Sequence, residues 1–260
     1  MKSWVWPVFM TGYRRQMAFR RAMLLGAVGS IGYAVIRLVV LESLYRDRDI
    51  VSGLSLEQAS VWAIFAGMLF TIVYPPWSHD FPDSIRSGEV VSDLLRPVST
   101  FAFQLAHQSG RLVAQALVRV TPFLILALWI LPVHAPDGLA GWSYFLVSLV
   151  FLAMSSVAFI YMLGTTAFFT ADHHVWLAFA FYAVQLLGGV YLPVEFIPGW
   201  AGDLVRAGPG MAFIASPTRI LNDIQPLQTL VIQGIWTVVF CGLAYSGLYL
   251  GRKRLVVFGG

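Results

Sequence analysis

The segment SGEVVSDLLRP, residues 87–97, places two carboxylates and one arginine between long apolar stretches. Between Gly88 and Pro97, the spacing of the apolar residues predicts a short amphipathic helix. Its apolar face would comprise Val90, Val91, Leu94 and Leu95, with Glu89 and Asp93 on the other side and Arg96 near the end. Such a helix suits docking on a soluble partner, its acids meeting basic groups and its leucines filling a groove. A helix that only lies on a membrane surface fits the same periodicity.

A second polar pattern runs into the third long apolar stretch, where His107, Arg111, Gln115 and Arg119 are spaced by four. At helical periodicity these residues form one slowly drifting stripe. Arg111 is expected to reach the inner lipid phosphates. Arg119 lies deeper, and either reaches those phosphates or meets an anionic headgroup or substrate. With Gln115, and with Gln185 in the fifth stretch, it is a candidate for lining a transport path, whereas helix packing is the plainer role of Gln185.

Residue patterns for bond chemistry or metal binding are not evident. The chain has no G-x-x-x-x-G-K-[ST] motif, so ATP chemistry would have to come from another chain. The single Cys241 excludes an intramolecular disulfide and a cysteine metal site. His173 and His174 are adjacent and would rarely converge on one ion, and the HDFPD segment at 79–83 is expected to be a loop. We therefore expect no cofactor bound by this chain.

The composition is that of a membrane protein. The chain is 58% hydrophobic and 12% charged, with a mean hydropathy of +0.74, whereas soluble domains carry about 25% charged residues. A spanning helix needs about 20 largely apolar residues. Six stretches qualify: 22–44, 57–74, 112–132, 142–169, 175–193 and 228–250. The predicted fold class is an all-α integral membrane protein, formed by a single domain over residues 1–260.

The distribution of basic residues predicts the orientation. Basic residues cluster before the first stretch, in the loop at 75–111 and after the last stretch, eleven against four in the other loops. The positive-inside rule therefore places both termini and the 75–111 loop in the cytoplasm. The net charge of +4 fits this rule and does not indicate nucleic-acid binding.

Two further segments complete the expected architecture. Residues 1–21 mix aromatic residues with arginine, which favours a helix lying in the cytoplasmic interface over a plain basic flank. Segment 193–226 is apolar but cut by prolines into pieces too short to cross. It is best interpreted as a pair of short re-entrant helices on the outer side, because irregular backbone enters a bilayer only where protein or water covers it.

These features together resemble the type-2 ATP-binding-cassette (ABC) permeases, the membrane subunits of bacterial exporters whose ATPase is a separate chain. The resemblance covers the whole chain and rests on the six spans, the interfacial helix, G-E-V-V-S-D-L-L-R-P-V at 88–98 and P-V-E-F-I-P at 193–198. It implies that residues 88–97 form a coupling helix seated in the ATPase. It also implies that the outer segment is a gate, with Pro193, Glu195, Phe196 and Pro198 at its start.

The resemblance further implies the partners. Two ATPase subunits would carry ATP and Mg²⁺, and a second permease chain, identical or related, would complete the path in the bacterial inner membrane. The aromatic spans favour a hydrophobic, amphipathic or lipid-like substrate. Two alternatives are an ion-coupled secondary transporter and a non-catalytic membrane scaffold. The first would need carboxylates inside the membrane, whereas Glu42 and Glu57 lie near span ends.

Overall fold

The computed structural model describes residues 4–73, 75, 78–95, 98–121, 136, 138–170 and 173–254. The α-helices are α1 (Val5–Met17), α2 (Arg20–Leu44), α3 (Leu56–Val73), α4 (Asp80–Arg86), α5 (Val90–Leu94), α6 (Thr100–Gln115), α8 (Gly138–Gly164), α9 (His173–Leu187), α10 (Gly199–Ala207), α11 (Ala215–Leu221) and α12 (Pro226–Arg252). Shorter turns are the π-helical η1 (Ala116–Val120) and the 3₁₀ elements η2 (Thr165–Phe168), η3 (Val194–Phe196) and η4 (Pro209–Ala212). Two strands, β1 (Ile50–Val51) and β2 (Leu54–Ser55), form an antiparallel hairpin.

Two long helices, α8 and α12, pack along each other, and α12 does so with its one buried face. Along this contact their buried residues recur at spacings of three or four. In α8 this stripe comprises Gly141, Phe145, Ser148, Leu152, Ser155 and Phe159; in α12 it comprises Thr229, Gln233, Thr237, Phe240, Ala244, Leu248 and Gly251. Spacings close to the helical period of about 3.6 residues keep one face of each helix toward its partner along its length.

The two stripes are joined by hydrogen bonds as well as by packing. The Ser148 hydroxyl donates to Gln233 Oε1 over 2.7 Å, and the hydroxyls of Ser155 and Thr237 lie 2.8 Å apart. Helices in lipid gain little from the hydrophobic effect between them, so small residues and interhelical hydrogen bonds hold such pairs together.

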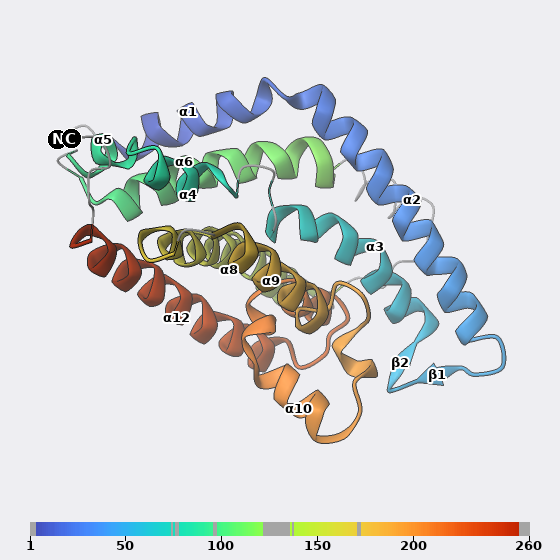
Figure 1. Ribbon diagram of the computed structural model, residues 1–260. Coiled ribbons are helices and arrows are strands. Elements are labelled where there is room, and N and C mark those ends of the chain that lie inside the picture. Colours follow the sequence, from blue (N-terminus) through green and yellow to red (C-terminus); the bar gives the residue numbers. More distant parts are fainter. Residues whose placement is uncertain are drawn as a thin grey trace.

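Helix α3 is buried on several faces, whereas α2 lies at the edge of the bundle (Figure 1). Consecutive residues 61–66 of α3 are all at most 5% exposed, which explains why this helix is apolar all round. In α2 the buried residues are Met23, Ala34, Arg37 and Leu41, and the opposite face is exposed and apolar.

The elements divide between two ends of the bundle. Figure 1 shows α1, α4, α5 and α6 at one end. The hairpin β1–β2 and α10 lie at the opposite end (Figure 1). The predicted docking segment and the predicted outer segment are therefore on opposite ends of the molecule.

Among the described residues, three helices are long and apolar enough to cross a membrane: α2, α8 with its extension η2, and α12. Two shorter apolar helices, within α3 and α9, match the second and fifth predicted spans. The third predicted span, 112–132, begins in α6 and continues through η1, and residues 122–132 lie outside the described part of the chain. The count of six spans stays a prediction.

Several boundaries differ from the sequence predictions. The interfacial segment 1–21 contains α1, which ends at Met17 before the chain turns at Ala18 and Phe19 into α2. The fifth span, predicted to reach residue 193, ends at Leu187, because Gly189 adopts a φ of +80° that breaks the helix.

The HDFPD segment at 79–83 is not a loop, because α4 begins at Asp80. Pro82 lies in the first helical turn, where a backbone N–H has no intrahelical acceptor, so proline does not prevent helix formation.

Candidate functional site

The predicted docking helix is present and shorter than expected. Helix α5 has one turn and a half, from Val90 to Leu94. Val90 is fully buried and Leu94 packs against the core, whereas Leu95 is 80% exposed and Glu89 is exposed. The predicted apolar face is thus split between an inward anchor at Val90 and an outward leucine just after the helix.

The remaining residues of the segment differ in their surroundings. Val91 is half-buried and Gly88 has a φ of +80°, which turns the chain into α5. Arg96 and Pro97 lie outside the described residues.

Asp93 accepts hydrogen bonds from α6 of the same chain, an interaction that the sequence did not indicate. The side-chain amide of Gln104, on α6, donates to Asp93 Oδ2 over 3.0 Å, and the Thr100 hydroxyl donates to the Asp93 carbonyl oxygen over 3.4 Å. Asp93 therefore ties α5 to α6. Glu89 is the carboxylate of the segment that is exposed.

Helix α4 connects this surface to the centre of the bundle. The Phe81 ring lies 4.3 Å from the ring of Tyr161, which is 1% exposed on α8. Phe81 also packs against Gly164 at the end of α8. Because α4 contacts both α5 and α8, a displacement of α5 has a packed route to the central helices.

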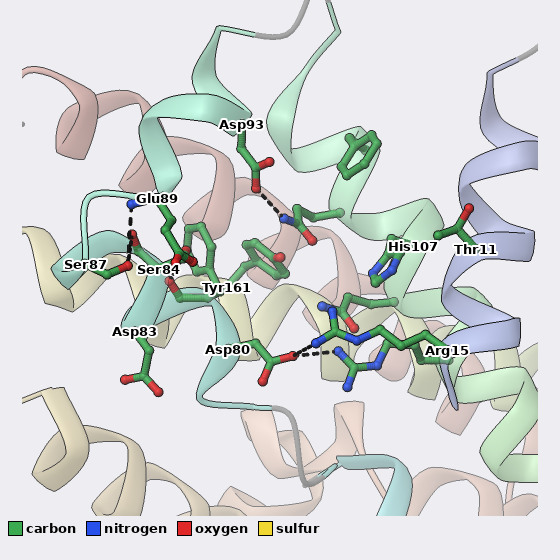
Figure 2. A pocket seen from close by; sticks show the side chains of 15 residues that line it. Thr11, Arg15, Asp80, Asp83, Ser84, Ser87, Glu89, Asp93, His107 and Tyr161 are labelled. Atoms are coloured by element: carbon green, nitrogen blue, oxygen red, sulfur yellow. Dashed lines mark hydrogen bonds and ion pairs between the residues drawn. The ribbon is translucent and has the colours of Figure 1, made fainter. Parts of the chain in front are cut away.

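A polar cavity of about 780 Å³ opens beside α5, lined from α1, α4, α5, α6 and α8 (Figure 2). Its central feature is the Asp80 carboxylate, which accepts a 2.8 Å hydrogen bond from Arg111 Nη1 and lies 3.6 Å from Arg15 Nη2. Arg111 is 6% exposed. The prediction that Arg111 reaches lipid phosphates is therefore wrong, because Asp80 supplies its counter-charge inside the protein.

His107 lies on the wall of the same cavity, across from Asp80 (Figure 2). Burial lowers the pKa of His107 to about 4, and the positive charges of Arg111 and Arg15 add to the effect of burial. The imidazole is therefore neutral at neutral pH. Asp80 and Asp93 act in the opposite direction and do not outweigh these causes.

Helix α1 is held tightly against α6. Gly12 lies against the backbone carbonyl of His107, and Gly110 lies against the backbone carbonyl of Phe9. Two glycines thus let the two helices approach to backbone contact. This arrangement places Arg15 at the cavity and makes α1 part of the same end as α5.

Arg119 and Gln185, two of the three transport-path candidates, line one cavity of about 530 Å³. It lies between α2, α3, η1 and α9, and Gln185 Oε1 accepts a 2.9 Å hydrogen bond from the Tyr191 hydroxyl there. The third candidate, Gln115, is 1% exposed and does not line it. Arg111 lines the first cavity and Arg119 lines this one, so the predicted stripe divides between two cavities.

Arg37 of α2 is 8% exposed and lies inside the bundle. Its guanidinium lies 4.2 Å from the Tyr33 ring centre, and its Nη2 donates to the Val190 carbonyl oxygen. The Trp62 indole donates to the neighbouring Gly189 carbonyl over 2.6 Å. These donors satisfy two carbonyls of the turn that follows α9, and they hold α2 and α3 to this turn.

Segment 193–226 contains two short helices, α10 and α11. That they re-enter the membrane from its outer side stays a prediction. The unpredicted feature of the segment is a buried ion pair, in which Arg219 Nη1 donates to Glu195 Oε1 over 2.5 Å with both side chains at most 15% exposed. Pro193 is buried and Phe196 packs against the core, whereas Pro198 is exposed. The pair joins the start of the segment to α11, and Arg219 also donates from Nε to the Thr229 hydroxyl of α12.

Comparison with known proteins identifies the family. A family model described as ABC-2 family transporter protein matches residues 31–259. No curated protein and no solved structure matches the chain. The family match covers most of the sequence, including α5, the outer segment and most of the residues that line the two cavities. The chain is therefore a multi-pass membrane protein that belongs to the ABC-2 transporter family, as its resemblance to type-2 permeases implied.

Proposed function

We propose that this chain is the permease subunit of an ATP-driven exporter in a bacterial cytoplasmic membrane. It pairs with a second permease chain, identical or related, and each permease is moved by a separate ATPase subunit that binds ATP and Mg²⁺. Both termini face the cytoplasm. The substrate is hydrophobic or amphipathic. The outer segment around Pro193, Glu195, Phe196 and Pro198 acts as the external gate.

One observation supports this proposal most directly. The two residues that flank helix α5, Glu89 and Leu95, are exposed, while Val90 anchors the helix inside. Through α4 it is packed against α8, the helix at the centre of the bundle. An element that is accessible on one side and mechanically connected on the other suits a docking lever.

The test changes only the exposed part of this surface. Glu89→Lys with Leu95→Asp reverses one charge and removes one apolar contact, without touching the bond between Asp93 and Gln104. The matched control, Glu57→Lys with Trp200→Asp, makes the same kinds of change at exposed residues of the opposite end.

The measurements are co-purification with purified candidate ABC ATPases and stimulation of their ATP hydrolysis in nanodiscs. We expect the Glu89/Leu95 variant to lose both, and the control to retain both. Normal stimulation by the Glu89/Leu95 variant would show that the ATPase does not dock at α5.

A further inference from the structure

We propose that the cavity between α2, α3, η1 and α9 binds the negatively charged headgroup of an amphiphilic molecule, with Arg119 contacting the anion. The binding is a property of this chain alone, and its role as a step in export rests on the proposed function. Arg119 is the cationic group that lines this cavity, and no carboxylate lines it among the described residues.

The charge of Arg119 has no counter-charge in the described part of the chain. No ion pair or hydrogen bond joins it to another described side chain, and its Nε is buried without a hydrogen-bond partner. Arg111, two turns earlier, has Asp80, and Arg219 has Glu195. A charge at membrane depth is costly unless it is paired, so the missing counter-charge indicates an anionic ligand.

The backbone near Arg119 is shaped for its guanidinium. A methyl group on Gly26 of α2 would lie 2.5 Å from Arg119 Nη2, so the guanidinium packs directly on the helix backbone. Arg119 itself lies in the π-helical turn η1, in which Thr121 N donates to the Ala116 carbonyl. Such turns occur mostly where a functional side chain is positioned.

The rest of the cavity favours an amphiphile over a small ion. Phe70, Val190 and the ring of Tyr33 supply apolar walls, while Gln185 and Tyr191 add a polar pair. Arg37 lies beyond Tyr33 and keeps the local potential positive, with its Nη1 buried and without a hydrogen-bond partner. An amphiphile would match both the charge of Arg119 and the apolar walls, with its anionic headgroup at Arg119 and its hydrocarbon chain along the walls.

The test measures binding by native mass spectrometry on the purified full-length chain in a neutral detergent. The probes are dodecyl phosphate, dodecyltrimethylammonium and inorganic phosphate, with phosphatidic acid as a competitor that shares the phosphate monoester but comes from the membrane. We expect dodecyl phosphate to bind at least about tenfold more tightly than either other probe. Displacement by phosphatidic acid would identify a lipid headgroup as the natural anion, and no displacement would identify a non-lipid amphiphile; both support the proposal.

Four variants make the test specific. Arg119→Gln should weaken dodecyl phosphate binding about tenfold or more, as expected on losing a charge-assisted hydrogen bond. Arg119→Lys should retain binding within about threefold, because it keeps the charge. Gly26→Ala keeps the arginine but displaces its guanidinium, and should also weaken binding. The control Arg21→Gln removes an exposed arginine from α2, the helix of Gly26, and should leave dodecyl phosphate binding unchanged.

Three outcomes would overturn the proposal: unchanged binding in both Arg119→Gln and Gly26→Ala, equal binding of the cationic probe, or equal binding of inorganic phosphate. Because no ATPase is present, failure here leaves the docking experiment on α5 unaffected. Conversely, loss of the docking assignment would leave the headgroup selectivity intact, so the two proposals fail separately.

Discussion

Gly12 and His107 meet where α1 crosses α6, with the α-carbon of the glycine against the backbone carbonyl of the histidine. Gly110 and Phe9 make the reciprocal contact one turn away. The close crossing packs the amphipathic helix α1 against α6, and α6 continues into the turn η1 that contains Arg119. It explains why α1 forms one unit with the polar end of the bundle.

We predict that Gly12→Ala destabilises the protein, because its methyl group would overlap a backbone carbonyl that cannot move without separating the helices. Overpacking of this kind costs about 1–3 kcal/mol. The control is Gly242→Ala on α12, where a methyl group would meet nothing within 4 Å. Thermal unfolding in detergent should show a lower midpoint for the first variant alone, and equal midpoints would contradict the close crossing.

Acidification should loosen the same end of the molecule through His107. The folded protein holds the pKa of His107 at about 4, whereas the unfolded chain has a value of about 6.5. The unfolded state therefore binds the proton more readily, so the contribution of His107 to stability is complete above about pH 6.5 and declines as the pH falls toward 4. Comparing unfolding midpoints of wild type and His107→Gln at pH 7.5 and 5 should give a smaller drop for the variant. An identical drop would assign the pH dependence to other groups.

Breaking the buried pair of Glu195 and Arg219 should be far more costly than breaking an exposed pair. Arg219→Leu leaves the Glu195 carboxylate, 15% exposed, without its cation, which we expect to cost about 3 kcal/mol. Asp203→Ala breaks the Asp203–Arg206 pair, in which the Asp203 side chain is 79% exposed, at a cost of about 0.5 kcal/mol or less. Chemical unfolding of the two variants should differ accordingly; similar losses would mean that the outer segment opens freely to water.

Gln233→Leu should weaken the packing of α8 against α12, because it removes the acceptor of the Ser148 hydroxyl and the donor to the Ser148 carbonyl. Interhelical hydrogen bonds in membranes contribute about 0.6–2 kcal/mol. The variant with both Gln233→Leu and Ser148→Ala should recover part of the loss, since it leaves no unsatisfied hydroxyl. The free energies of unfolding of the single and the double variant test this. If the double variant is no more stable than Gln233→Leu alone, the shape of the side chains and not the unsatisfied hydroxyl determines the loss.

The two ends should lie on opposite sides of the membrane. In a Cys241→Ser background, a cysteine at Leu95 should react with an impermeant maleimide only in inside-out vesicles. A cysteine at Trp200, which is 79% exposed on α10, should react only in right-side-out vesicles. Reaction of both positions from one side would contradict the proposed topology.

Local features of the chain were predictable from the sequence. High hydropathy predicted the membrane class, and the GEVVSDLL segment predicted a helix between Gly88 and Pro97. Prolines predicted that 193–226 would form short pieces. These features depend on solvent transfer and on backbone preferences of neighbouring residues, which are properties of a short window of chain.

The partners of the charged residues were decided by the tertiary structure. Periodicity placed Arg111 and Arg119 on one stripe, yet packing gave Arg111 the carboxylate of Asp80 from α4 and left Arg119 facing Gly26. Likewise, Asp93 pairs with Gln104, and Arg219 pairs with Glu195 across a proline-rich loop. Sequence spacing determines the direction of a side chain on its own helix. The group that this side chain contacts depends on how two helices approach each other. Their approach is determined by the packing of the whole bundle.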